Sequence, residues 1–163
     1  MTLFSIGHSN VAIEGFVELL RSNGIEVLVD TRSQPYSRYL PHFAQRELRR
    51  AVEDAGIQYV YLGDKIGGRP EGSQFYLESG KVDYDLLSLS EDYLAGSDKL
   101  VQLGAKQPVV FMCAEADYHR CHRYLLITRT LVDRGIEVRH ILHSGEVVTS
   151  NASEFLPEQP SLF

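Results

Sequence analysis

The chain of 163 residues contains two cysteines, two methionines and no tryptophan. Two cysteines are too few for the disulfide framework of a small secreted domain, and we expect both thiols to be reduced. No apolar run approaches the ~20 residues that a membrane helix needs, and residues 1–9 lack the basic region and long apolar stretch of a signal peptide. We therefore expect a cytoplasmic protein without membrane association.

Lysine is also scarce, because the cationic residues are twelve arginines and four lysines. Asp and Glu number 22, so the formal net charge at pH 7 is −6. This balance excludes a protein that coats nucleic acid or an anionic membrane by bulk electrostatics. The bias toward arginine favours bidentate contacts with carboxylate or phosphate groups. The positions of the arginines should therefore indicate more about function than their number.

What the chain does contain is a regular alternation of strand and helix patterns, with 44% hydrophobic residues for one core. Strands are expected at residues 3–6, 26–29, 57–61, 108–112 and 137–142, and helices near 13–20, 43–55, 84–104 and 124–132. Three similar turns, at residues 22–25, 54–57 and 133–136, each place a glycine between a helix and the next strand. The pattern predicts an α/β fold, namely one domain over residues 1–145 with a mainly parallel five-stranded sheet and helices on both faces. A flexible tail is expected over residues 146–163.

Two polar segments interrupt this alternation. Residues 63–72 are rich in glycine and open a stretch too long for an ordinary connection, which indicates a functional or mobile loop. Residues 113–123 form the densest polar cluster and follow the most apolar expected strand. That strand is expected at the centre of the sheet, covered on both faces.

Because the carboxyl ends of parallel strands meet at one edge, where open α/β sheets bind ligands, the loops after the strands supply the candidate site residues. The candidates in these loops are His8, Ser9, Asp30, Arg32, Arg38, Gly68, Arg69, Cys113, Glu115, His119, Cys121, His122 and Arg123. We expect Asp30, Arg32, Arg69, Glu115 and Arg123 to share one pocket. The structural alternative is that Asp30 and Arg32 form an ion pair that only ties strand ends together, and that Arg69 is solvated.

The arginines favour a site for phosphate or carboxylate. The substrate-binding candidates are Ser9, Arg32, Arg38, Gly68, Arg69, His122 and Arg123, and free amides at the start of the helix near Cys121 would add to anion binding. The glycine-rich segment lacks the Lys and the Ser or Thr that end a P-loop, and no dinucleotide-binding pattern follows the first strand. Standard ATP or NAD binding is therefore not indicated, and the cofactor is left open.

Cys121 is the candidate nucleophile. It is expected at a helix N-terminus between Arg120 and His122, a setting that lowers a thiol pKa and supplies a base. Cys113, at a strand end, is expected to be a packing residue. The spacing from Cys121 to a following arginine differs from the Cys, five residues, Arg loop of cysteine phosphatases, so a phosphatase is not favoured. An inert thiol in a tight loop is the alternative for Cys121.

Glu115 is the first candidate for a general acid or base, followed by His8 and Asp30. The favoured alternative for the carboxylates is that they are counterions of the arginines.

Zinc is a third chemistry that the polar cluster suggests. Cys113, His119, Cys121 and His122 are ligand types that zinc prefers, and Cys113 with Glu115 superficially resembles the ligand and acid/base pair of zinc deaminases. The second half of that signature is absent, and the adjacent Cys121 and His122 would point to different sides of a helix start. We therefore predict no metal, and these four residues are the ligands if one binds.

Four motifs together point to a known family. They are Ile6-Gly7-His8-Ser9, then Val29-Asp30-Thr31-Arg32 with Pro35 and Ser37-Arg38, then Leu62-Gly63 with Gly67-Gly68-Arg69, and Met112-Cys113-Ala114-Glu115 with Cys121-His122-Arg123. In this order they resemble the motifs of the DUF488 family, a domain of unknown function, over residues 3–143. The family more often has Asp-Val-Arg where this chain has Asp30-Thr31-Arg32. The resemblance implies an α/β domain of bacteria and archaea that is presumed to be an enzyme, and it carries no activity over.

The C-terminus has a motif of its own. Residues 159–163 resemble the short peptide by which bacterial replication and repair proteins dock on the sliding clamp, whose usual form is Gln-Leu-Ser/Asp-Leu-Phe. Gln159 would be the polar anchor and Leu162 and Phe163 would fill a hydrophobic pocket, whereas Pro160 departs from the preferred Leu. The alternative is that Leu162 and Phe163 fold back onto the core.

These observations favour an enzyme of the DUF488 type that acts on a phosphate-bearing substrate, either a nucleotide or nucleic acid. Its link to DNA repair or replication would be the clamp-binding tail. The reaction type is not predicted. The alternative, from another functional class, is a non-catalytic module that binds an anionic ligand or nucleic acid with the same arginines.

Overall fold

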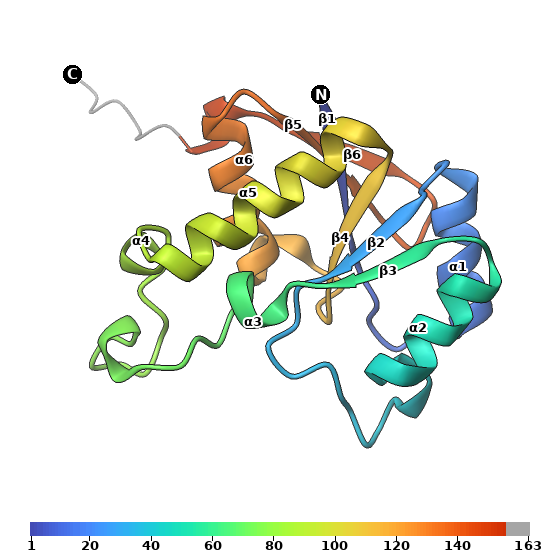
Figure 1. Cartoon of the computed structure of the whole chain (residues 1–163), viewed down its shortest axis with the longest axis horizontal. Coiled ribbons are helices and arrows are strands. Elements are labelled where there is room, and N and C mark those ends of the chain that lie inside the picture. Colours follow the sequence, from blue (N-terminus) through green and yellow to red (C-terminus); the bar gives the residue numbers. More distant parts are fainter. Residues whose placement is uncertain (156–163) are drawn as a thin grey trace, which may run out of the picture.

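The computed structural model describes residues 1–155 of the chain. Its strands form a six-stranded sheet in the order β3-β2-β4-β1-β5-β6 (Figure 1). The strands are β1 (Thr2–Gly7), β2 (Val27–Asp30), β3 (Gln58–Tyr61), β4 (Val109–Cys113), β5 (Glu137–Ile141) and β6 (Val147–Ser150). Strands β1 to β5 pair in parallel, and β6 pairs antiparallel with β5. The expected α/β fold with a mainly parallel sheet is confirmed.

Helices cover both faces of this sheet, as expected, with α1 and α2 on one face and α5 and α6 on the other (Figure 1). The helices are α1 (Ile13–Ser22), α2 (Gln45–Asp54), α3 (Gly63–Ile66), α4 (Tyr84–Leu87), α5 (Glu91–Lys106), the π-helix η4 (Arg123–Thr128) and α6 (Arg129–Asp133). Short 3-10 helices are η1 (Pro41–Phe43), η2 (Ser73–Phe75), η3 (Tyr118–Arg120) and η5 (Ala152–Phe155). Among the described residues, none of the helices has the length and hydropathy that crossing a bilayer requires.

The central strand β4 explains how two hydrophobic cores form. All five of its residues are buried, because β2 and β1 flank it and helices cover both of its faces. Val110 and Met112 belong to the core under α1 and α2, and Val109 and Phe111 belong to the core under α5 and α6. This alternation follows the two-residue period of a strand. The most apolar expected strand is therefore the central one, as predicted.

The three similar turns return the chain from a helix to a parallel strand. Gly24, Gly56 and Gly135 have φ angles of 69°, 81° and 77°, a left-handed conformation that residues with a side chain rarely adopt. The repeated glycine thus marks the ends of α1, α2 and α6 and fixes the starts of β2, β3 and β5.

The sixth strand differs from the prediction of five. Residues 147–150, which the sequence analysis assigned to a flexible tail, form β6 beside β5. Gly145, at a φ of 90°, allows the hairpin turn, and the Leu142 amide donates to the Glu146 carbonyl at 2.9 Å. The Ser-Gly pair before two valines was the signal for this hairpin. The clamp-binding candidates Gln159, Leu162 and Phe163 lie outside the described residues.

The helix expected over residues 124–132 has two parts, because a π-helix precedes α6. The hydroxyl of Thr128 donates to the Arg123 carbonyl at 2.6 Å across the wide first turn. A π-helix is rare and occurs frequently at functional sites. Here it begins directly after the motif Cys121-His122, with Arg123 as its first residue.

Candidate functional site

The loops after β1, β2 and β4 meet at the carboxyl edge of the sheet, as predicted. The His8 and Ser9 amides donate to the carbonyls of Cys113 and Ala114, at 3.0 and 2.9 Å, and the Thr31 amide donates to Met112 at 3.0 Å. These backbone bonds extend the parallel pairing beyond the strands. They hold the three polar loops in fixed positions relative to one another.

A cavity of about 810 Å³ opens at this edge. The predicted site residues that line it are Arg32, Gly68, Arg69, Cys113, Glu115, Cys121 and His122. Gly68 packs so closely on His122 that a Cβ atom would lie 2.8 Å from the imidazole ring. A smaller neighbouring cavity of about 340 Å³ includes His8 and Ser9 and shares Arg32 with the first.

The structure does not bring every candidate into the cavity. Asp30 and Arg123 are buried and do not line it, so the expectation that they share a pocket with Arg69 and Glu115 was wrong for these two residues. The Arg38 guanidinium lies on the loop after β2, where it donates to the Tyr39 hydroxyl at 2.7 Å and stacks over its ring. The side chains of Asp30, Arg38 and Arg123 lie outside the cavity, and the spacing of residues in the sequence does not predict where a side chain points.

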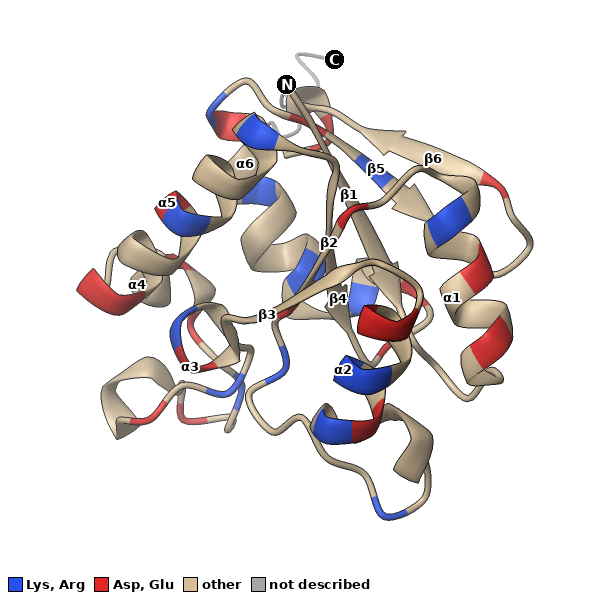
Figure 2. Cartoon of the chain, turned by 45° about the vertical axis from the view of Figure 1, so that its right-hand side comes forward, with Lys and Arg blue, Asp and Glu red and all other residues tan. Residues whose placement is uncertain are grey.

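The cavity carries an excess of positive charge that the rest of the surface does not share. Over α1, α2 and α5 the acidic and basic residues are interspersed (Figure 2). The rim of the large cavity, by contrast, carries Arg69, Lys81 and Arg120, and Glu115 is the carboxylate among its lining residues. Lys81 and Arg120 were not among the predicted binding residues. An anion entering this cavity would meet more positive than negative charge.

Asp30 and Arg32 form a closed ion pair beneath the cavity. Arg32 Nε and Nη2 donate to the two carboxylate oxygens of Asp30, at 2.9 and 2.8 Å, and Arg32 Nη1 donates to the Phe43 carbonyl at 2.7 Å. The Tyr59 hydroxyl donates to Asp30 at 2.6 Å. Asp30 is 0% exposed and Arg32 is 6% exposed. This geometry supports the structural alternative of the sequence analysis, an ion pair that ties strand ends together.

The two histidines of the site are neutral. Burial lowers the pKa values of His8 and His122 to about 4. His8 Nδ1 donates to the Ser9 carbonyl at 2.7 Å, and its ring stacks on Phe43. His122 Nε2 donates to the Thr31 carbonyl at 3.1 Å. A backbone carbonyl holds one ring nitrogen of each histidine. Each ring can therefore position its neighbours, or accept a proton with its other nitrogen.

Cys113 and Cys121 lie in direct contact. Their sulfur atoms are 3.1 Å apart, and both line the large cavity. The hydrogen bond from Cys113 and the positive charge of Arg123 lower the pKa of Cys121 to about 6, although burial opposes the shift. The same hydrogen bond, together with burial, raises the pKa of Cys113 well above its usual range. The opposite directions of the two pKa shifts favour a pair in which Cys121 is the thiolate and Cys113 the thiol.

Arg123 carries a buried positive charge. Its side chain is 1% exposed, Nη1 donates to Ser5 Oγ at 3.2 Å, and Nη2 donates to the Glu115 carbonyl at 3.0 Å. Within residues 1–155, Nε has no hydrogen-bond partner, and no carboxylate lies within ion-pair distance of the guanidinium. A buried charge without a counterion is costly. The Cys121 thiolate is the anion that this cation can stabilise.

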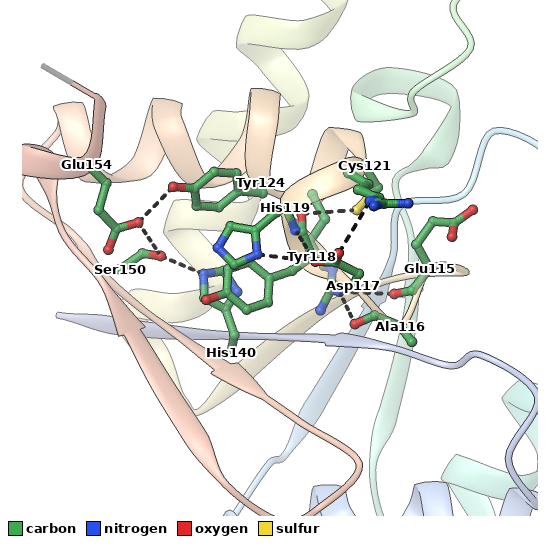
Figure 3. A network of polar contacts seen from close by, with 12 residues as sticks. Glu115, Ala116, Asp117, Tyr118, His119, Cys121, Tyr124, His140, Ser150 and Glu154 are labelled. Atoms are coloured by element: carbon green, nitrogen blue, oxygen red, sulfur yellow. Dashed lines mark hydrogen bonds and ion pairs between the residues drawn. The ribbon is translucent and has the colours of Figure 1, made fainter. Parts of the chain in front are cut away.

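A polar network that Arg123 joins through Ser5 was missed by the sequence analysis, and Figure 3 labels its members Tyr118, His140 and Ser150. Ser5 contacts His140 Nδ1, and His140 Nε2 lies 2.8 Å from the Ser150 hydroxyl. Parallel pairing places Ser5 directly opposite His140. The His140 ring stacks on Tyr118 at 3.8 Å between centroids. Ser5 in β1 and His140 in β5 are polar residues at buried positions of their strands, and this was the signal in the sequence. Because Arg123 donates to Ser5, the network holds the Arg123 guanidinium in place.

The four residues considered as zinc ligands are not assembled. His119 Nδ1 contacts Asp117 on the surface, and His122 Nε2 is bonded to Thr31. In the part of the chain that the structure describes, no group of three or more His, Cys, Asp or Glu side chains is placed to hold a metal ion.

The comparison with known families gives one result. Residues 12–131 match the family described as Domain of unknown function DUF488. No curated protein and no solved structure matches the chain at the significance required. The matched part contains Arg32, Glu115 and Cys121, whereas His8 precedes it. Because the match covers most of the sequence, the chain belongs to the DUF488 family, whose function is unknown.

Proposed function

We propose that this DUF488 protein is an enzyme that acts on a phosphate-bearing substrate, a nucleotide or a nucleic-acid end, with Cys121 as its nucleophile. The observation that carries the proposal is the position of Cys121 in the cavity, two residues before Arg123, whose buried guanidinium has no carboxylate partner among the described residues and lowers the pKa of the Cys121 thiol. Such a cation favours the thiolate, which is the reactive form of cysteine. We place this activity in the cytoplasm, where thiols stay reduced.

The rim of the cavity supports the substrate class. Arg69, Lys81 and Arg120 line the same cavity as Cys121, so a phosphate group that they bind would lie in the space above the sulfur. In the proposed reaction Cys121 is the nucleophile, and Glu115, which lines the same cavity, is the general acid or base.

Alkylation of the wild-type protein at pH 7 tests this proposal. Iodoacetamide should label Cys121 at least about tenfold faster than Cys113, because only Cys121 is largely ionised at that pH. Inorganic phosphate or a nucleoside monophosphate should slow the labelling of Cys121, and this protection should weaken in Arg69→Ala and Arg120→Ala.

The matched control is Arg49→Ala, an arginine on α2 that pairs with Glu53 and does not line the cavity. Protection should be unchanged in this variant. Preferential labelling of Cys113 would contradict the role of Cys121, and labelling that phosphate leaves unaffected would contradict the substrate class.

A specific observation favours the second candidate function, a module that binds nucleic acid without catalysis. Tyr36 and Tyr39 are 71% and 78% exposed, and Arg38 stacks over the Tyr39 ring at 4.9 Å. Tyr36 lines both cavities. Exposed aromatic rings beside arginine are typical of surfaces on which the bases of a single strand stack.

For this module we expect Tyr36→Ala to weaken the binding of a short single-stranded oligonucleotide by about tenfold, because a base–aromatic stack contributes roughly 1–3 kcal/mol. Fluorescence anisotropy measures the affinity, and Leu89→Ala, an exposed side chain that lines neither cavity, is the control. Equal affinity of wild type and Tyr36→Ala would remove the support for stacking.

The link to DNA repair or replication through a sliding clamp stays a prediction, tested by titrating the clamp with a peptide of residues 151–163.

A further inference from the structure

The two thiols of the chain occupy complementary positions at the bottom of the large cavity. Cys113 is the last residue of the central strand β4, and Cys121 directly precedes the turn into the π-helix η4. Their side chains are 2% and 7% exposed, yet both line the cavity. A small solute that enters the cavity can reach both sulfur atoms, whereas a bulky reagent meets little exposed surface.

Their ionisation states are also complementary. Cys121 is stabilised as a thiolate by the Cys113 thiol and by Arg123, while Cys113 keeps its proton. A thiolate is the form that attacks a peroxide, and a neighbouring thiol is the group that converts the resulting sulfenic acid to a disulfide. The contact thus keeps Cys121 as the thiolate that the first oxidation step requires and Cys113 as the thiol that the second step requires.

We propose that Cys113 and Cys121 form a peroxide-sensitive dithiol, in which Cys121 is the sulfur that reacts with a hydroperoxide and Cys113 resolves the product to an intramolecular disulfide. In the first step Cys121 Sγ attacks one peroxide oxygen, the oxygen–oxygen bond breaks, and Cys121 becomes a sulfenic acid while the leaving alkoxide or hydroxide takes a proton from water. In the second step Cys113 Sγ bonds to Cys121 Sγ, the sulfur–oxygen bond breaks, and hydroxide leaves with the Cys113 proton as water. Two electrons pass from the dithiol to the peroxide.

The geometry needs only a small movement for the second step. A disulfide bond is about 2.05 Å long, so the sulfur atoms have to approach by about 1 Å from their separation of 3.1 Å. Cys113 is fixed by the pairing of β4, so Cys121 has to make the approach; it follows a segment of mostly exposed residues that is tied to Ser9 and Arg123 through the Ala114 and Glu115 carbonyls. This oxidation goes beyond the proposed function, because it depends on the two sulfurs and not on the substrate that the cavity binds.

Intact-mass analysis of the full chain tests the inference. The protein is reduced, freed of reductant and treated with hydrogen peroxide near pH 7 in the presence of a chelator. Wild type should lose the mass of two hydrogen atoms without forming a dimer, and a phosphine reductant should restore the starting mass. In Cys113→Ser and Cys113→Ala, Cys121 should stop at the sulfenic acid and be captured by dimedone, a reagent for sulfenic acids.

The matched variant is Cys121→Ser, in which Cys113 is the remaining cysteine. It should form the dimedone adduct more slowly than Cys113→Ser does, because burial still favours the protonated form of Cys113 after the hydrogen bond to Cys121 is lost. A dimedone adduct on wild-type Cys121 with no intramolecular disulfide would overturn the role of Cys113. Faster oxidation of Cys113 in Cys121→Ser than of Cys121 in Cys113→Ser would overturn the role of Cys121. The first result leaves the proposed function untouched, whereas the second would also contradict Cys121 as its nucleophile; phosphate protection tests the substrate class separately.

Discussion

Replacing Arg123 with methionine is expected to raise the pKa of Cys121 from about 6 to about 8, so that the thiolate fraction at pH 7 falls by about tenfold. Methionine fills much of the space of the arginine but brings no charge. Burial, which disfavours the thiolate, then acts against the hydrogen bonds from Cys113 and from the backbone amide of residue 123. The pH dependence of the ultraviolet thiolate absorbance, and of the alkylation of Cys121, measures the shift.

Two variants separate charge from structure in this experiment. Arg123→Lys keeps a positive charge near Cys121, so the pH midpoint of the thiolate titration should stay low. Arg120→Met removes an exposed arginine that pairs with Asp117, and it should leave this midpoint unchanged. The same midpoint in wild type and Arg123→Met would show that Arg123 is not the counterion of the thiolate.

The sign of the accompanying stability effect follows from the direction of the shift. The pKa of Cys121 is lower in the folded chain than its ordinary value of 9, so the unfolded chain binds more protons between those two values. The thiolate therefore adds to the free energy of unfolding as the pH rises from about 6 to 9. This contribution is lost as the pH falls through 6, and it should be much smaller in Arg123→Met.

The fold could be predicted from sequence because its signals are local. Apolar strand patterns, amphipathic helices and the glycine turns at residues 24, 56 and 135 each act within a few residues of one another. Their order alone implies parallel strands, and parallel strands imply one edge where polar loops converge. The sixth strand was missed because it has four residues and two of them, Thr149 and Ser150, are polar, so it carries little hydrophobic pattern.

The roles of the arginines could not be predicted in the same way. Arg32 and Arg123 occur in loops that resemble those of Arg69 and Arg120, but two of these guanidinium groups are buried and two are exposed. The difference depends on partners from other strands. Tyr59 and Asp30 meet because β3 pairs with β2, and Ser5 lies opposite His140 because β1 pairs with β5. Register of this kind is a property of the folded sheet.

Replacing Asp30 with alanine is expected to lower the free energy of unfolding by about 3–5 kcal/mol, because it leaves the guanidinium of Arg32 buried without its carboxylate. The Tyr59 hydroxyl loses its acceptor as well. Since the free energy of unfolding of small proteins is about 5–15 kcal/mol, the loss would be a large part of it. Urea unfolding, followed by circular dichroism, measures it.

The control is Glu53→Ala, which removes the exposed ion pair with Arg49 on α2 and should change the free energy of unfolding by less than about 1 kcal/mol. Asp30→Asn keeps the shape of the side chain but loses its charge, so it should fall between Asp30→Ala and wild type. The comparison also decides the role of Asp30. A carboxylate that transferred protons to a substrate would be replaced at little cost to stability, whereas one that neutralises Arg32 would not. Wild-type stability in Asp30→Ala would therefore favour the catalytic role that the sequence analysis considered, and a loss of several kcal/mol would assign Asp30 to the support of the site.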